Sequence, residues 1–245
     1  MQLAVQLYTL RRSLDDDFEG TLAVLAEAGT REVELAGLHG RSPGAMRAAL
    51  DAAGLVACAG HVPLEQFEAA PDRVVEAANT LGTDTIVVPW VPPPETVIEA
   101  DATVARIVEA FEVATGAGLG FAYHNHDFEF WVLEDGSDLW SRIAAAGLPQ
   151  EPDVGWLLVA GRDPVTVLGE LGGRCPLVHA KDARRRPDGT WEDVIVGDGD
   201  ADWPAIAAAA DAAGATRLVV ELDHPSAHPV DDVALSLATL RDALP

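Results

Sequence analysis

The sequence FAYHNHDFEFW occupies residues Phe121–Trp131 and shows how this chain folds. It begins with apolar side chains typical of a buried strand. It then presents a cluster of polar side chains, namely His124, Asn125, His126, Asp127 and Glu129. Burying such a cluster is costly unless the side chains bind something. Later apolar runs end in the same way, with EPDVGW reaching Asp153, LVHAKD reaching His179 and LVVELDH reaching Glu221. The recurrence predicts several strands whose polar ends meet at one site.

Eight apolar, β-favouring runs alternate with helical stretches. They are LAVQLY (3–8), REVELA (31–36), LVACAGH (55–61), DTIVVPW (84–90), LGFAYHNH (119–126), PQEPDV (149–154), CPLVHAKD (175–182) and RLVVELDH (217–224). The helical stretches end at glycines such as Gly29, Gly54 and Gly118, as expected of a left-handed helix end. Apolar strands alternating with helices indicate parallel pairing. We therefore expect one α/β domain over residues 1–245, a single-domain (β/α)8 TIM barrel.

Composition narrows the classes of function. The formal net charge of −24 argues against nucleic acid and membrane partners, which need a basic protein face. No strand is followed by a GxGxxG or GxxxxGKS motif, so dinucleotide and P-loop sites are not expected. Cys58 and Cys175 lie in apolar runs and are expected to be buried thiols. The N-terminal residues lack the features of a signal peptide, and we expect a cytoplasmic protein.

Polar side chains gather at one end of the predicted strands, and in a parallel barrel those ends open on one face. His124, Asp153, His179 and Glu221 come from four successive strands. Two imidazoles and two carboxylates suit Mn²⁺, Zn²⁺, Co²⁺ or Fe²⁺ better than Mg²⁺ or Ca²⁺. We expect these four residues to bind one divalent metal ion.

Each candidate also has a simpler interpretation. A lone histidine at a strand end is more often a hydrogen-bonding residue than a ligand. Glu34 is also consistent with a salt bridge, and Lys181 with a local ion pair to Asp182. The stretch Arg184–Arg186 reads as a solvated loop, although it lies near the mouth where an anionic substrate would enter.

The ordered set YHNHDFEF, EPDVGW with AGRDP, LVHAKD, VGDGDADW and VVELD resembles the xylose isomerase-like TIM barrel family. The resemblance covers essentially the whole chain. The family includes sugar phosphate isomerases/epimerases, among them tagatose and psicose epimerases, hydroxypyruvate isomerases and inosose dehydratases. Its metal is typically held by a Glu, an Asp, a His and a Glu. Asp153, His179 and Glu221 match the last three, whereas His124 stands where the family has its first Glu.

The resemblance implies a metal-dependent isomerase or epimerase that acts on a sugar or related polyhydroxy carbonyl compound by enolisation. Because His124 replaces a carboxylate, Glu221 is the natural single base, and His126 and Glu129 are the further catalytic candidates. Glu129 has an alternative role in orienting His126. The expected substrate contacts are Gln6, Glu34, His61, Trp156, Lys181 and Asp223.

Three alternatives remain open from the sequence. The first is a dehydratase or lyase acting on a keto-inositol or keto-sugar. The second is a nuclease like the related AP endonucleases, which the acidic composition disfavours. The third is a non-catalytic sugar-binding barrel. The expected partner is a small-molecule sugar or polyol, and the short loops leave a homo-oligomer open.

Overall fold

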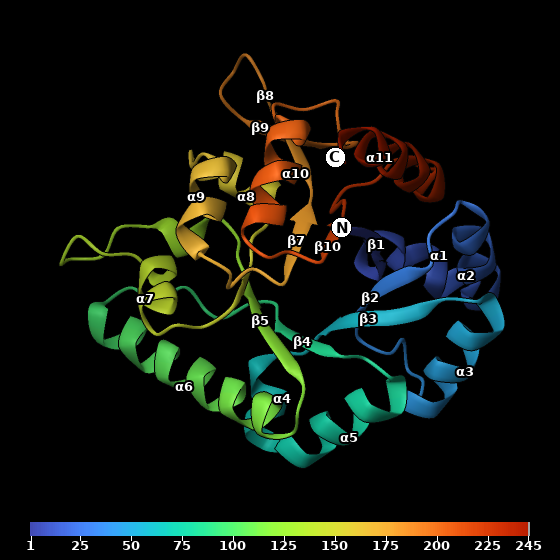
Figure 1. Cartoon of the computed structure of the whole chain (residues 1–245), viewed down its shortest axis with the longest axis horizontal. Coiled ribbons are helices and arrows are strands. Elements are labelled where there is room, and N and C mark those ends of the chain that lie inside the picture. The colour runs from blue at the N-terminus through green and yellow to red at the C-terminus, as the bar shows by residue number, and fades with distance from the viewer. Residues whose placement is uncertain (245) are drawn as a thin grey trace.

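The computed structural model describes residues 1–244 and contains an eight-stranded parallel sheet that curves into a barrel (Figure 1). The strands follow one another in the order β6-β5-β4-β3-β2-β1-β10-β7. Their bounds are β1 (Gln2–Gln6), β2 (Glu32–Ala36), β3 (Val56–His61), β4 (Thr85–Val88), β5 (Gly120–His124), β6 (Gln150–Glu151), β7 (Leu177–Ala180) and β10 (Arg217–Val220). Each predicted apolar run coincides with one of them, and β1 begins one residue before its run. The prediction of a single-domain (β/α)8 TIM barrel is confirmed.

The barrel closes between its two terminal strands, β6 and β7. A single parallel bridge joins Asp153 to His179 there, and the His179 N–H donates to the Pro152 carbonyl over 2.9 Å. Lower down, the Gln150 N–H donates to the Arg174 carbonyl over 2.9 Å. Proline has no N–H to give to a ladder, so the prolines at 149 and 152 keep β6 short. The closing seam is therefore the least hydrogen-bonded part of the barrel wall.

Helices surround the strands and cover the outside of the barrel (Figure 1). The helices are α1 (Arg11–Asp16), α2 (Phe18–Glu27), α3 (Pro43–Ala53), α4 (Leu64–Ala69), α5 (Pro71–Leu81), α6 (Val97–Gly116), α7 (Leu139–Ala145), α8 (Val154–Val159), α9 (Pro164–Leu171), α10 (Trp203–Ala212) and α11 (Pro229–Ala243), with 3-10 turns η1 (Leu7–Leu10) and η2 (Phe128–Phe130). Helix α3 shows the predicted signals: Ser42 caps its start and Gly54 ends it with φ +70°. No helix among residues 1–244 is long and apolar enough to cross a membrane.

The interior of the barrel changes character along its axis. Its amino-terminal part is filled by small apolar side chains, namely Ala4, Cys58, Ala59, Val87, Ala122, Leu177 and Val219. Both cysteines are buried free thiols, as predicted. The carboxyl ends of the strands instead carry buried polar groups, which include Gln6, Glu34, His124, Glu151, Asp153 and His179. The fold therefore concentrates its polar chemistry at one end of the barrel.

A β-hairpin lies outside the barrel sheet and was not predicted. It consists of β8 (Asp182–Arg185) and β9 (Trp191–Val194), which pair antiparallel. It includes most of the Arg184–Arg186 stretch, which we expected to be a loop. Arg184 and Arg186 both form ion pairs with Glu192 across the hairpin. These two guanidinium groups are therefore paired within the chain.

Candidate metal centre

The four residues predicted to bind a metal lie together at the carboxyl ends of the strands. His124 ends β5, and His179 lies in β7. Asp153 lies two residues after the end of β6, and Glu221 directly follows β10. Their donor atoms all lie within 4.8 Å of one another. His179 Nδ1 is 3.0 Å from Glu221 Oε2 and 3.8 Å from Asp153 Oδ2, and His124 Nε2 is 4.0 Å from the same Asp153 oxygen. We call these four residues the outer set.

The outer set fits a divalent transition metal. Asp153 Oδ2 is buried and accepts no hydrogen bond, although it faces both imidazoles and lies 3.3 Å from Lys181 Nζ. A buried carboxylate oxygen without a hydrogen-bond partner is costly, and a cation would satisfy it. The mixture of nitrogen and oxygen donors suits Mn²⁺, Fe²⁺, Co²⁺ or Zn²⁺.

A second polar layer lies deeper in the barrel, beneath the imidazoles. Gln6 and Glu34 are fully buried, and the Gln6 amide donates to Glu34 Oε2 over 2.8 Å. The same Glu34 oxygen lies 2.6 Å from His179 Nε2. We expected both residues to contact a substrate. In the structure, Glu34 contacts His179 and Gln6 contacts Glu34, and neither residue lines the cavity described below.

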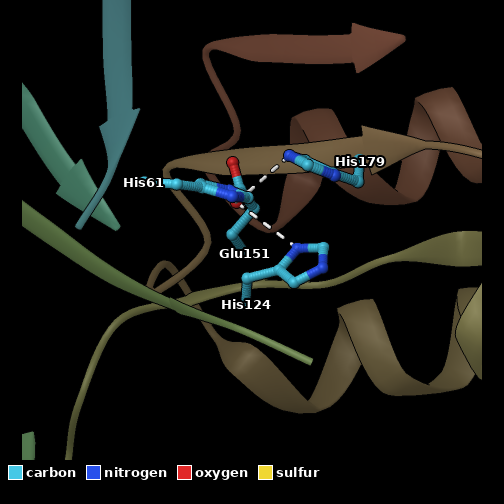
Figure 2. Close-up of side chains that lie close together, drawn as sticks. All are labelled: His61, His124, Glu151 and His179. Atoms are coloured by element: carbon cyan, nitrogen blue, oxygen red, sulfur yellow. Dashed lines mark hydrogen bonds and ion pairs between the residues drawn. The ribbon is translucent and has the colours of Figure 1, made fainter. Parts of the chain in front are cut away.

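Glu151 belongs to this deeper layer and was missed in the sequence. Its Oε2 lies 3.3 Å from His179 Nε2, 3.4 Å from His61 Nε2 and 3.6 Å from His124 Nδ1. Figure 2 shows the three imidazoles arranged around this carboxyl group. Burial and the nearby Glu34 charge raise the pKa of Glu151 to about 7. A signal was present, because Glu151 precedes Asp153 by two residues and alternate residues of a strand share a face.

A cavity of about 1040 Å³ opens onto the outer set. Seven of the predicted site residues line it, namely His61, His124, His126, Trp156, Lys181, Glu221 and Asp223. Arg11, which the sequence did not single out, also lines the cavity and donates from Nη2 to the Asp223 carbonyl over 2.8 Å. The cavity continues along α5, past Val74 and Ala78. The cavity therefore has a polar wall at the ends of the strands and a larger apolar part along α5.

Comparison with known proteins places the chain in a family. The family model for the xylose isomerase-like TIM barrel matches residues 22–243. This chain belongs to that family. The resemblance inferred from the sequence motifs is thereby confirmed, and no curated protein matches the chain.

Solved structures of the family share the whole fold. A sugar phosphate isomerase/epimerase from Parabacteroides distasonis is 24% identical, with a TM-score of 0.85 over 98% of this chain and 93% of that one. The zinc-bound IOLI protein is 16% identical, with a TM-score of 0.75 over 100% and 98% of the two chains. The probable 3-DHS dehydratase AsbF from Bacillus anthracis is 14% identical, with a TM-score of 0.72 over 98% and 99%.

Lys181 supplies the fixed positive charge of this family member's site. Its Nζ lies 2.7 Å from Asp223 Oδ2, 3.0 Å from Glu221 Oε2 and 3.3 Å from Asp153 Oδ2. Burial alone would lower the pKa of Lys181, but these carboxylates raise it well above the usual range. For the carboxyl group of Glu221, burial alone would raise the pKa, but the Lys181 and His179 charges hold this pKa well below the usual range. Glu221 is therefore an ionised carboxylate beside an ammonium group.

Glu129 does not reach the cavity. Its oxygens accept from the Tyr123 hydroxyl and the His126 backbone N–H, both over 2.7 Å, and its side chain is fully buried. Burial raises its pKa to about 8. The contacts match the alternative role, that of positioning His126, and not the expected catalytic role. His126 itself lines the cavity, and burial together with the Lys181 charge lowers its pKa to about 4, which leaves a neutral imidazole.

Proposed function

We propose that this protein is a metal-dependent isomerase or epimerase of a sugar or a related polyhydroxy carbonyl compound. The observation that carries the proposal is the outer set itself: two imidazoles and two carboxylates within 4.8 Å of one another. Two of these residues, His124 and Glu221, line a cavity large enough for a sugar. The site lies at the carboxyl ends of the strands, where barrel enzymes have their active sites.

The outer set would hold one divalent ion through His124, Asp153, His179 and Glu221. When bound there, the ion would act as a Lewis acid that polarises the substrate carbonyl and acidifies the neighbouring carbon. The residues of the cavity wall then have defined tasks. Lys181 and Asp223 present a donor and an acceptor for sugar hydroxyls, and Trp156 offers an apolar face beside them.

Glu221 is the residue placed to remove the proton. Its Oε2 is held by His179 and Lys181, and the side chain lines the cavity. The other oxygen, Oε1, is then the atom available to a proton on the substrate carbon. Return of a proton at a neighbouring atom completes an isomerisation, and His126 is a neutral imidazole on the same cavity wall that can carry it.

Removal of the proton leaves a carbanion next to the substrate carbonyl. If this carbanion loses a β-hydroxyl instead of taking up a proton, the reaction is a dehydration. The two outcomes separate in heavy water, with a ketose and a keto-inositol as test substrates. Isomerisation places deuterium in a product of unchanged composition, whereas elimination gives an absorbing enone. A product that carries deuterium and no enone supports the proposal, and an enone supports the dehydratase alternative.

Glu221→Gln tests the base directly. We expect kcat to fall roughly 10²–10⁴-fold, the usual contribution of a general base. The control is Glu27→Gln, since Glu27 is an exposed residue at the end of α2 and lies away from the carboxyl ends of the strands, where the site is. Elemental mass spectrometry of both variants shows whether the metal is retained. Full activity of Glu221→Gln with metal bound would overturn the assignment.

A further inference from the structure

We propose that the cluster contains a second metal position, deeper than the outer set and alternative to it. It is formed by His61, His124, Glu151 and His179, which we call the inner set (Figure 2). The inference rests on the proposed function for the role of the outer position. It assigns the inner position to four-coordinate ions such as Zn²⁺.

The spacing of the inner donors matches tetrahedral coordination. Three imidazole nitrogens lie 3.3, 3.4 and 3.6 Å from one oxygen of Glu151. With metal–ligand bonds of about 2.0–2.1 Å, neighbouring donors of a tetrahedral site are separated by roughly 3.4 Å. The corresponding separations in the outer set spread from 3.0 to 4.0 Å. The three separations between Glu151 and the imidazoles therefore already match those that a tetrahedral ion requires.

Unsatisfied atoms point to the same position. His124 Nδ1 and Glu151 Oε1 are both buried and have no hydrogen-bond partner. Glu34 adds a further negative oxygen beside His61 and His179, at 3.4 and 2.6 Å from their Nε2 atoms. His61 and His124 line the cavity, so an ion can reach the inner set from the mouth. These features favour a cation below the level of the outer set.

The inner and outer sets use opposite nitrogens of the same two rings. His124 faces Glu151 through Nδ1 and Asp153 through Nε2. His179 faces the inner carboxylates through Nε2 and the outer ones through Nδ1. A neutral imidazole has one lone pair, and its other nitrogen carries a proton. A ring that binds an ion on one side therefore donates N–H on the other, so one ion binds at a time.

The donor sets differ in the ions they favour. Three imidazoles and one carboxylate suit Zn²⁺ or four-coordinate Co²⁺, whereas the outer set has two carboxylates and faces the cavity, which suits Mn²⁺ with additional oxygen ligands. Occupation of the inner position draws the ion away from the cavity wall. Zn²⁺ would then compete with Mn²⁺ for the protein and hold it in a state without a metal ion beside the substrate.

The test compares one isosteric variant of each set in the full-length, chelator-treated protein. Zn²⁺ affinity is measured by competition with a chromophoric chelator, and Mn²⁺ affinity by electron paramagnetic resonance of the free ion. In Glu151→Gln we expect Zn²⁺ affinity to fall at least about tenfold more than Mn²⁺ affinity. In Asp153→Asn we expect Mn²⁺ affinity to fall more than Zn²⁺ affinity. His61→Gln is a second inner variant, should Glu151→Gln fail to fold.

The outcomes separate this proposal from the proposed function. An unchanged Zn²⁺ affinity in both inner variants, or two Zn²⁺ ions bound per chain, overturns the alternative inner position. If Asp153→Asn still loses Mn²⁺ in that case, the outer site of the proposed function stands. If the inner variants lose both ions and Asp153→Asn loses neither, the inner site stands and the outer site falls. The visible spectrum of the Co²⁺ protein gives an independent readout, because intense bands of four-coordinate Co²⁺ should disappear in Glu151→Gln.

Discussion

Glu34, Glu151, Asp153 and Glu221 place four buried carboxyl groups at one end of the barrel. The imidazoles respond differently to this environment. Burial alone would lower the pKa of His61 and of His179, but the surrounding carboxylates raise both. Burial lowers the pKa of His124 well below its usual value, and the neighbouring positive groups add to the effect. The raised pKa values of these two imidazoles and of Lys181 favour positive charges that offset part of the carboxylate charge, and a divalent ion would displace the protons of the imidazoles that it binds.

Glu129 gives a prediction for the dependence of stability on pH. Its folded-state pKa of about 8 lies above the ordinary value of 4.5. Its contribution to stability is therefore fully present below about pH 4.5 and is lost as the pH rises toward 8, because the unfolded state ionises first. Each pKa unit corresponds to about 1.4 kcal/mol, so the loss amounts to a few kcal/mol.

Glu129→Gln is the variant that isolates this effect. An amide can accept from the His126 N–H and donate to the Tyr123 oxygen, so both contacts can persist without an ionisable group. We expect the melting temperature of the variant to fall less between pH 5 and pH 8 than that of the wild-type protein. The measurement is thermal unfolding by circular dichroism across this range. Parallel curves for the two proteins would show that Glu129 is not the group responsible.

At the scale of elements, Asp182 joins the hairpin to the segment before α10. Its carboxylate accepts N–H groups from Ala183, Gly197 and Ala201 and from the Trp203 indole. This explains the VGDGDADW motif, which wraps around one buried carboxylate. Gly199 approaches so closely that an added Cβ would overlap the Asp182 carboxylate and lie 2.8 Å from the Ala183 carbonyl oxygen.

Gly199→Ala should therefore destabilise the protein, by about 1–3 kcal/mol for an overpacked contact against backbone. Gly44→Ala is the matched control, because Gly44 lies in α3 with open space around its Cβ position. The control should be neutral or stabilising by up to about 1 kcal/mol. Urea unfolding measures both changes. Equal stability of the two variants would refute the close approach at Gly199.

The elements also show what the sequence can and cannot predict. Apolar runs that end in polar residues located all eight strands, because buried parallel strands need continuous apolar character. The hairpin β8–β9 was not predicted because its strands carry charged residues and are only partly buried, although Asp188-Gly189 is a turn signal. Depth along the barrel axis was also not predictable. Gln6 and Glu34 were expected to contact a substrate, and in the structure they lie buried beside His179. Periodicity indicates which side chains point inward and not the level at which they lie.

At the scale of the whole molecule, both metal positions span the weakest seam of the barrel. The inner set joins β3, β5, β6 and β7, and the outer set joins the ends of β5, β6, β7 and β10. The seam itself has only the Asp153–His179 bridge and a few backbone hydrogen bonds. A bound ion at either position would therefore link the two strands that the backbone joins least.

Hydrogen exchange tests this consequence of the topology. The His179 amide, which is bonded to the Pro152 carbonyl, should exchange faster in the metal-free protein than the amides of β1, which pairs with neighbours on both sides. At a metal concentration of about 100 times Kd, an opening that releases the ion is opposed by roughly 2.7 kcal/mol, or about a hundredfold in exchange rate. The His179 amide should slow by up to this factor with Mn²⁺ or Zn²⁺, and the β1 amides should change much less. Because both positions span the seam, this result holds whichever set binds the ion. An unchanged His179 rate with bound metal would contradict the prediction, because it would show that the seam opens without release of the ion.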